Sequence, residues 1–449
     1  MRILLVYPSQ LAENGSVIKY TKAYLPPLAL AQLAALIPER HEVLLVNDAV
    51  EDMKPYYQLS LDLVCITAMT MQAERAYNIA DQFRRRGTKV VMGGIHPTVL
   101  PEEAKKYTDT VVIGEAELVF EQVLDDAERG ALKEIYHGSP CDLQQLVRPR
   151  WEIFKLSNYL KQPGSWWPMM PLFTSRGCPL GCKFCTVTHI YGKSYRFKPV
   201  ENVLREIEAV NADKFFFVDD NIMASPVFSR ELFQALKGKG IHWISQASTT
   251  MLRHPELIEL AGKAGCVALF IGIESISQNT LSTMNKGFNK CDHYKELFDR
   301  LYRANIVPYV SLILGFDQDT PETFQQTLNF LKENNIMLSS MAILTPLPGT
   351  LMYEEMEKAG KITKSQWSMY DSYHVVFKPD RFSPEELLSS YWSTFRNFYS
   401  MSDEINSHVR EHYPSLSKIS FFGALSYQEY ASMQLKMNLH PMAPGTGRL

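Results

Sequence analysis

Cysteine is scarce in this sequence, and its scarcity excludes a fold built on disulfides. Only 7 of the 449 residues are cysteine, an odd number. Four of them, Cys65, Cys141, Cys266 and Cys291, lie far apart along the chain. A disulfide scaffold needs many closely spaced cysteines, and an isolated cysteine in an apolar run is usually a small core residue. Free thiols of this kind predict a reducing, cytoplasmic location.

An excess of one charge and long hydrophobic runs are also lacking. The formal net charge is only -3, which argues against the basic surface that nucleic acid binding requires. No run of 18 or more apolar residues occurs, so no transmembrane helix is expected, and residues 1–8 begin as a strand without a signal-peptide pattern. A hydrophobic content of 46% over 449 residues predicts a folded protein of two or three domains.

The three remaining cysteines form the most informative motif in the chain. Residues 176–185 read RGCPLGCKFC, which spaces Cys178, Cys182 and Cys185 as C-x3-C-x2-C. A short loop of this kind can direct three thiolates at one centre. Three thiolates leave one iron of a 4Fe–4S cluster open to a reactive ligand. A zinc site with His189 as its fourth ligand is the alternative.

Residues 1 to about 145 alternate between short apolar runs and helical segments. The runs cover residues 3–7, 42–47, 63–68, 89–92 and 110–113, and the helical segments cover 27–36 and 73–86. This alternation predicts an α/β fold with a doubly wound, Rossmann-like parallel sheet, which binds ligands at the carboxyl ends of its strands. Those ends carry Thr67 and Met69, then Gly93 and Gly94, then Glu115. The two glycines either let a ligand approach the backbone or only form a turn.

Residues from about 146 to 360 repeat a second strand–helix pattern after a joint rich in proline and tryptophan at 149–168. The six candidate strands cover residues 169–174, 214–218, 242–246, 267–273, 307–314 and 340–344. Repeats of this length predict a partial (β/α)6 barrel of the TIM type, with its active site at the carboxyl ends of the strands.

Polar groups follow several of these barrel strands. Asp219, Asp220 and Asn221 come after the second strand, and Gln246 and Glu274 end the third and fourth. Each of the first three could instead cap the next helix.

Residues from about 361 to 449 contain no catalytic pattern. Tyr391, Phe395, Phe398 and Tyr399 follow helical spacing, for which core packing is the simplest interpretation. A lid over the barrel mouth is the functional alternative, so this mainly helical region is expected to cap the substrate.

The cysteine loop, with Phe184 before its last cysteine, resembles that of the radical SAM superfamily. The resemblance implies that Cys178, Cys182 and Cys185 hold a 4Fe–4S cluster whose open iron binds S-adenosylmethionine (SAM). It also implies that residues at the strand ends and after the loop contact the cofactor. The end of the second strand would face the SAM amino group, and Glu274 would suit the ribose. Arg196 would neutralise the SAM carboxylate or the cluster. The residues concerned are Asp219, Asp220, Asn221, Gln246, Glu274 and Arg196. A surface position for Arg196 is the alternative.

The first 145 residues resemble the cobalamin-binding domain that precedes many radical SAM barrels. The resemblance rests on the stretch GGIHPT at 93–98 and on GEAE at 114–117, and it implies that Thr67, Met69, Gly93, Gly94 and Glu115 surround cobalamin. One departure is clear: residues 9–15 read SQLAENG, where some relatives have Asp-x-His-x-x-Gly with a cobalt-ligating His. Cobalamin is then bound without a lower protein ligand, or the domain has lost it; His96 is not predicted to ligate cobalt.

The combined resemblance implies a cobalamin-dependent radical SAM enzyme that methylates an unactivated carbon of a small-molecule or lipid-like intermediate. A 5′-deoxyadenosyl radical would abstract hydrogen, and the substrate radical would receive a methyl group carried by cobalamin. The expected electron donor is a flavodoxin or ferredoxin. A radical oxidoreductase or cyclase without methyl transfer is one alternative, and a non-catalytic iron–sulfur redox protein is another. No catalytic residue is assigned.

Overall fold

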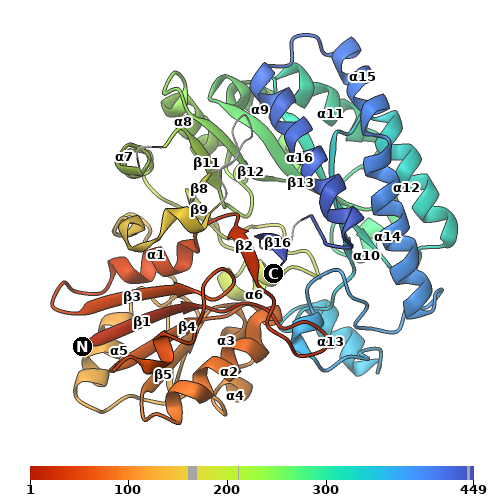
Figure 1. Cartoon of the computed structure of the whole chain (residues 1–449). Helices are drawn as coiled ribbons and strands as arrows, with labels where there is room; N and C mark the ends of the chain where they lie inside the picture. The colour runs from red at the N-terminus through yellow and green to blue at the C-terminus, as the bar shows by residue number, and fades with distance from the viewer. Residues whose placement is uncertain (160–168, 211, 442–444, 449) are drawn as a thin grey trace.

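We describe the protein from a computed structural model, which defines residues 1–159, 169–210, 212–441 and 445–448 (Figure 1). The second half of the predicted joint, residues 160–168, lies outside this part. No helix among the described residues is long and apolar enough to cross a membrane.

The N-terminal part is a six-stranded parallel sheet in the order β3-β1-β4-β5-β6-β7. Helices pack on both faces, so the sheet separates two apolar cores, one beneath α1 and α5 and the other beneath α2. This confirms the predicted doubly wound fold. The strands are β1 (Arg2–Tyr7), β3 (Glu42–Asn47), β4 (Leu63–Thr67), β5 (Lys89–Gly93), β6 (Thr110–Ile113) and β7 (Ile135–His137), and the helices are α1 (Leu28–Ala35), α2 (Ala73–Arg84), α3 (Ile95–Val99), α4 (Pro101–Ala104) and α5 (Phe120–Glu128).

The central part is a second six-stranded parallel sheet whose strands follow chain order, as the predicted partial barrel requires. A strand followed by a helix and a parallel neighbour builds such a barrel by repetition. Its strands are β8 (Met170–Leu172), β11 (Lys214–Phe217), β12 (His242–Ala247), β13 (Cys266–Glu274), β14 (Val307–Leu314) and β15 (Leu338–Ile343), and its helices are α7 (Val200–Val210), α8 (Pro226–Leu236), α9 (Pro255–Lys263), α10 (Gln278–Thr283), α11 (Tyr294–Arg303), α12 (Pro321–Glu333) and α13 (Leu351–Lys358).

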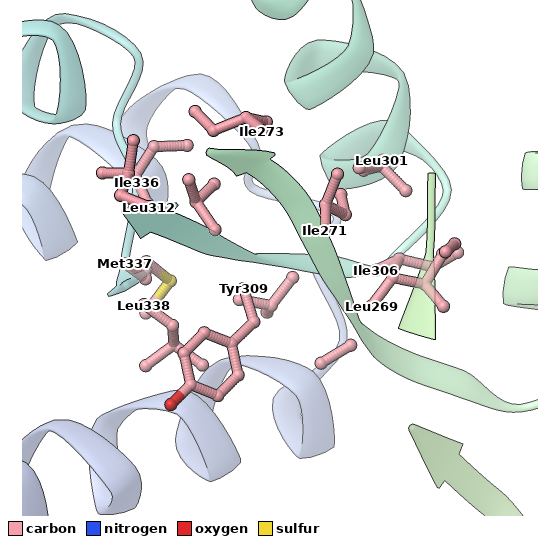
Figure 2. Close-up of a cluster of buried hydrophobic side chains, with 14 of the residues drawn as sticks. Leu269, Ile271, Ile273, Leu301, Ile306, Tyr309, Leu312, Ile336, Met337 and Leu338 are labelled. Atoms are coloured by element: carbon pink, nitrogen blue, oxygen red, sulfur yellow. The ribbon is translucent and has the colours of Figure 1, made fainter. Parts of the chain in front are cut away.

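The C-terminal part is helical: α14 (Pro384–Ser400), α15 (Ser402–His412) and α16 (Lys418–Lys436). Ser383 caps α14 by accepting a hydrogen bond from the Glu386 backbone, and Pro384 occupies its first turn. Figure 2 shows β13 and β14 with helices on both faces, and Tyr309 of β14 pointing toward a C-terminal helix. The Tyr309 hydroxyl lies 2.6 Å from that of Tyr427 in α16. The four aromatic residues predicted as core, Tyr391, Phe395, Phe398 and Tyr399, are all buried in the barrel core. These helices therefore cover one face of the open barrel.

Two short antiparallel ladders complete the fold. Strands β9 (Ser175–Arg176) and β10 (Arg196–Phe197) pair across the cysteine loop and α6 (Thr186–Tyr191). Near the chain ends, β16 (Gly445–Arg448) pairs with β2 (Tyr20–Ala23). The first ladder fixes the loop at the junction of the two sheets, where α6 lies in Figure 1.

Candidate functional site

The three motif cysteines lie in the loop between β9 and α6, all partly buried. Burial raises the pKa of each thiol, that of Cys185 to about 11, and the neighbouring thiols add to the effect at Cys185. A zinc ion bound at about 2.3 Å would bring its sulfur ligands to about 3.8 Å from one another. Among the described residues, only Glu115, Glu117 and Cys141 gather ligand atoms within 4.8 Å of one another, so the three motif thiols are not gathered at the spacing of a zinc site.

Asp219 and Asp220 position the backbone around this loop. Asp219 is fully buried, and its carboxylate accepts hydrogen bonds from the Thr174 hydroxyl at 2.7 Å, the Thr174 backbone at 3.0 Å, and the Ser175 hydroxyl. Asp220 accepts a bond of 2.9 Å from the backbone N–H of Gly177, next to Cys178. Burial raises the pKa of Asp220 to about 6. Contacts of these two carboxylates with SAM stay a prediction.

Asn221 offers a free acceptor in the same place. Its amide nitrogen donates to the Ser248 hydroxyl at 3.2 Å, but its Oδ1 is buried without a hydrogen-bond partner in the described part of the chain. A buried polar atom without a partner is costly and uncommon. An ammonium donor such as the amino group of SAM would satisfy it, so the residues present fit this ligand.

Glu274 and Gln246 lie at the carboxyl ends of neighbouring strands, as predicted. Glu274 has a positive φ of 61° and pairs with the buried Lys286 at 2.7 Å. Lys286 also lies 5.6 Å from the ring of Phe184, inside the cysteine loop. Gln246 is partly buried, and its backbone carbonyl accepts from Ile222. Lys286 is a cation beside the loop that the sequence motif did not single out.

A cavity of about 420 Å³ opens at the carboxyl ends of the N-terminal sheet. All five residues predicted to surround cobalamin line it: Thr67, Met69, Gly93, Gly94 and Glu115. Gly94 has φ +97°, and a Cβ at this position would come within 2.7 Å of the Thr67 hydroxyl. A side chain at Gly94 would also collide with the backbone of Ala68, so the close packing of the two strand-end loops in this wall requires glycine here. Arg176 and Tyr191, from the two ends of the cysteine-loop region, close the opposite side.

The loop after β1 does not reach this cavity with a histidine. Its Ser9 backbone and Lys19 bind the buried Asp48, which also pairs with Arg75 at 2.7 Å. Gln10 crosses to the C-terminal part and donates to the Ser368 carbonyl at 2.6 Å and to Asp371 at 3.0 Å. These contacts hold residues 9–15 outside the lining of the cavity at the N-terminal sheet.

His96 also lies elsewhere. It is fully buried, bonded to the Tyr77 hydroxyl at 2.8 Å and packed against Trp367. It is not among the residues that line the cavity.

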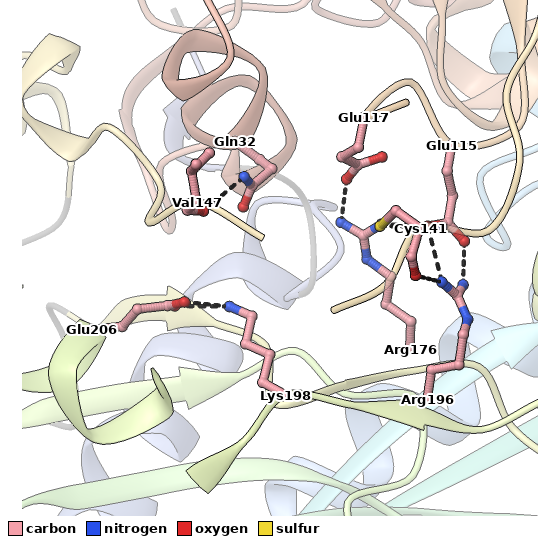
Figure 3. A network of polar contacts seen from close by, with 9 residues as sticks. All are labelled: Gln32, Glu115, Glu117, Cys141, Val147, Arg176, Arg196, Lys198 and Glu206. Atoms are coloured by element: carbon pink, nitrogen blue, oxygen red, sulfur yellow. Dashed lines mark hydrogen bonds and ion pairs between the residues drawn. The ribbon is translucent and has the colours of Figure 1, made fainter. Parts of the chain in front are cut away.

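An ion-pair network joins the cavity to the cysteine loop (Figure 3). Arg176 binds Glu115 at 2.8 Å and Glu117 at 2.5 Å, and Arg196 binds Glu115 and the Cys141 carbonyl. Burial alone would raise the pKa of Glu115, but hydrogen bonding from Arg196 and the charge of Arg176 outweigh it and lower the pKa below its usual range. Because guanidinium groups already neutralise these carboxylates, the set formed by Glu115, Glu117 and Cys141 is an interdomain clamp and not a metal site.

A second cavity, of about 330 Å³, lies inside the barrel against the middle of β13–β15. Ser311, Ser340 and Phe270 line it from the barrel, and Thr186 lines it directly after the last motif cysteine. Met69 and Ile95 belong to the walls of both cavities. The cavity of the N-terminal sheet, the cysteine loop and this second cavity thus meet at one place.

Family comparisons agree with this geometry. The model of the radical SAM superfamily matches residues 172–331, and that of the B12 binding domain matches residues 16–124. The bacteriochlorophyllide d C-12(1)-methyltransferase of Chlorobaculum tepidum is 33% identical over 406 residues, 88% of this chain and 87% of the relative. The chain belongs to the cobalamin-dependent radical SAM methyltransferase family. It is an enzyme, and its cofactors are a 4Fe–4S cluster, SAM and cobalamin.

Two further comparisons support the family and the fold. The bacteriochlorophyllide d C-8(2)-methyltransferase of Chlorobaculum tepidum is 31% identical over 425 residues, 91% of this chain and 92% of the relative. The structure of the cobalamin-dependent SAM radical enzyme OxsB, with aqua-cobalamin and SAM bound, superposes with a TM-score of 0.69 at 15% identity, over 98% of this chain and 76% of that one. At this identity the match to OxsB speaks for the fold alone.

Proposed function

We propose that this enzyme methylates an unactivated carbon of a small-molecule or lipid-like intermediate held in the second cavity, which we call the acceptor chamber. The observation that supports it is the shared wall: Met69 and Ile95 line both the corrinoid cavity and the acceptor chamber, while Thr186 joins the chamber to the cysteine loop. A methyl donor, a source of radicals and an acceptor can therefore lie in contact. Bound cobalamin supplies methyl transfer, and the cluster with SAM supplies the radical.

In this proposal the protein residues hold the cofactors and shield the radical from water. Cys178, Cys182 and Cys185 hold the cluster, Asn221 accepts from the SAM amino group, and Gly94 lets the corrinoid approach the backbone. Asp219, Asp220, Gln246 and Glu274 support the SAM side, the first two through the loop backbone. Arg196, predicted to neutralise the SAM carboxylate or the cluster, instead pairs with Glu115 in the clamp. Thr67, Met69, Gly93 and Glu115 support the corrinoid side. The clamp excludes water between the two, which protects a radical from side reactions.

We also propose a three-part division of the chain: a cobalamin domain at 1–145, a radical SAM barrel at 146–360, and a helical substrate-capping region at 361–449. Contributions of Asp371 and His440 to the chamber wall support a capping role for the last part. A flavodoxin or ferredoxin is the electron donor that we expect.

The test uses anaerobically reconstituted enzyme, SAM with a deuterated methyl group, and candidate acceptors such as tetrapyrroles and triterpenes. We expect labelled methyl in the product and formation of both 5′-deoxyadenosine and S-adenosylhomocysteine. If 5′-deoxyadenosine appears without label transfer or S-adenosylhomocysteine, the enzyme is a radical oxidoreductase or cyclase. If the protein binds no corrinoid, the proposal is wrong.

A further inference from the structure

The acceptor chamber has no cation among the described residues of its wall. Its lining residues include neither lysine nor arginine; the ionisable ones are Asp371, His440, Tyr370 and Tyr373. Burial lowers the pKa of His440 to about 4, so this imidazole is neutral near pH 7. Burial also raises the pKa of Tyr373 well above its ordinary value, which keeps the phenol uncharged.

The one carboxylate in the wall is already satisfied. Asp371 is bonded to His374 Nδ1 at 2.9 Å, accepts from the Tyr373 backbone at 3.0 Å, and accepts from Gln10 at 3.0 Å. Its hydrogen bond with His374 raises the pKa of that imidazole, which favours a charge-balanced pair. The wall therefore supplies no free positive charge, and its single negative charge has its partner beside it.

The rest of the wall is apolar and adaptable, with small hydroxyl groups. Met69, Met71 and Met341 contribute thioether side chains, and Phe270 and Leu347 add hydrocarbon. Methionine side chains fit irregular apolar shapes. Ser311 and Ser340 are neutral hydrogen-bonding groups. A volume of about 330 Å³ lies at the small end of the range for ligand pockets.

We infer that the part of the substrate held in the acceptor chamber is uncharged and mainly hydrocarbon, and that carboxylate or phosphate groups of the substrate stay outside it. This inference rests on the proposed function for the identity of the chamber as the acceptor site. Its physical reason is that an anion moved out of water needs a cationic partner to offset its lost hydration. Among the described residues, the wall offers no cation, only scattered hydroxyl groups between apolar side chains.

The experiment compares two fluorescent probes of similar shape, 2-naphthol and 2-naphthoate, on the reconstituted full-length enzyme at pH 7. Affinities are measured by fluorescence and by saturation-transfer NMR. We expect 2-naphthol to bind about tenfold or more tightly than 2-naphthoate, because only the anion loses hydration without a partner. Ala342→Leu, which narrows the chamber, should weaken 2-naphthol binding and so locate the probe there.

A matched pair of variants tests the charge argument directly. Met71→Lys places a cation in the chamber wall, and Met71→Gln is a neutral side chain of comparable length. We expect 2-naphthoate to bind the lysine variant about tenfold more tightly than the glutamine variant. Thermal melting and far-UV circular dichroism confirm that each variant is folded.

Equal affinity of both probes for the unaltered enzyme, with equal sensitivity to Ala342→Leu, would overturn the inference. The inference would also be overturned if 2-naphthol did not bind, or if Ala342→Leu did not weaken its binding. Corrinoid absorbance and SAM cleavage are recorded on the same samples. Probe binding requires no turnover. If corrinoid absorbance or SAM cleavage is absent while the probe preference remains, the proposed function is wrong and the inference about the chamber wall still stands.

Discussion

Removing the charge of Glu115 should destabilise the junction between the two sheets. Glu115 is the carboxylate that Arg196 contacts, and it shares Arg176 with Glu117. In Glu115→Gln, Arg196 keeps the Cys141 carbonyl at 2.7 Å as its acceptor but loses the ion pair. A guanidinium would then be held at a largely buried interface without a balancing charge.

The expected cost follows from the burial of these groups. The side chain of Glu115 is 5% exposed, that of Arg176 13% and that of Arg196 21%. Removing one member of a buried ion pair typically costs 3–5 kcal/mol, so with Arg176 still paired to Glu117 we expect the lower end, about 3 kcal/mol. Exposed pairs contribute far less, about 0–1 kcal/mol.

Urea unfolding followed by circular dichroism measures the change, with Glu121→Gln as the matched control. Glu121 is exposed on the same domain, in α5, where such a substitution should change stability by less than about 0.5 kcal/mol. If Glu115→Gln costs no more than the control, the network does not clamp the domains and our reasoning about it fails.

Three further outcomes follow from the geometry. Cys182→Ala should abolish SAM cleavage, measured as 5′-deoxyadenosine, while circular dichroism stays unchanged; retained cleavage would refute the cluster assignment. Gly94→Ala should weaken corrinoid binding, measured by absorbance titration, far more than Gly130→Ala. Both glycines have positive φ, but only the Cβ added at Gly94 collides with Thr67 and Ala68 and so displaces the cavity wall; equal effects would contradict this role of Gly94. Burial would raise the pKa of Asp48, but its partners Arg75 and Lys19 outweigh burial and lower the pKa below its usual value. The stability that this carboxylate contributes is therefore present above about pH 4, and it is lost as the pH falls through the lowered pKa. The urea midpoint of the apoprotein should therefore drop in acid, and Asp48→Asn should lower the midpoint at pH 7 and flatten this drop; an unchanged acid profile would count against it.

Local signals in the sequence predicted most of the fold and the positions of several candidate site residues at the strand ends. Apolar runs and helical periodicity placed both parallel sheets, because burial of one face leaves a pattern in a few consecutive residues. The glycines and short polar runs at the strand ends placed five residues around one cavity for the same reason, since parallel strands end at one edge.

The partners of charged residues could not be predicted in this way. Arg196 and Glu115 are 81 residues apart, and Gln10 and Asp371 are 361 residues apart. Such pairs depend on how the domains pack, which no local pattern records. The sequence offered one hint of the Arg176 ion pairs: Arg176, beside the cysteine loop, is opposite in charge to the Glu-x-Glu run after β6. The acceptor chamber was missed because its wall combines the two sheets with a C-terminal segment that has no motif.

The common wall formed by Met69 and Ile95 has a consequence for how the enzyme is supplied. A corrinoid seated in its cavity blocks that side of the chamber, so the acceptor must come and go by a different route. In the proposed function, the corrinoid would therefore stay in place while one acceptor leaves and the next one enters.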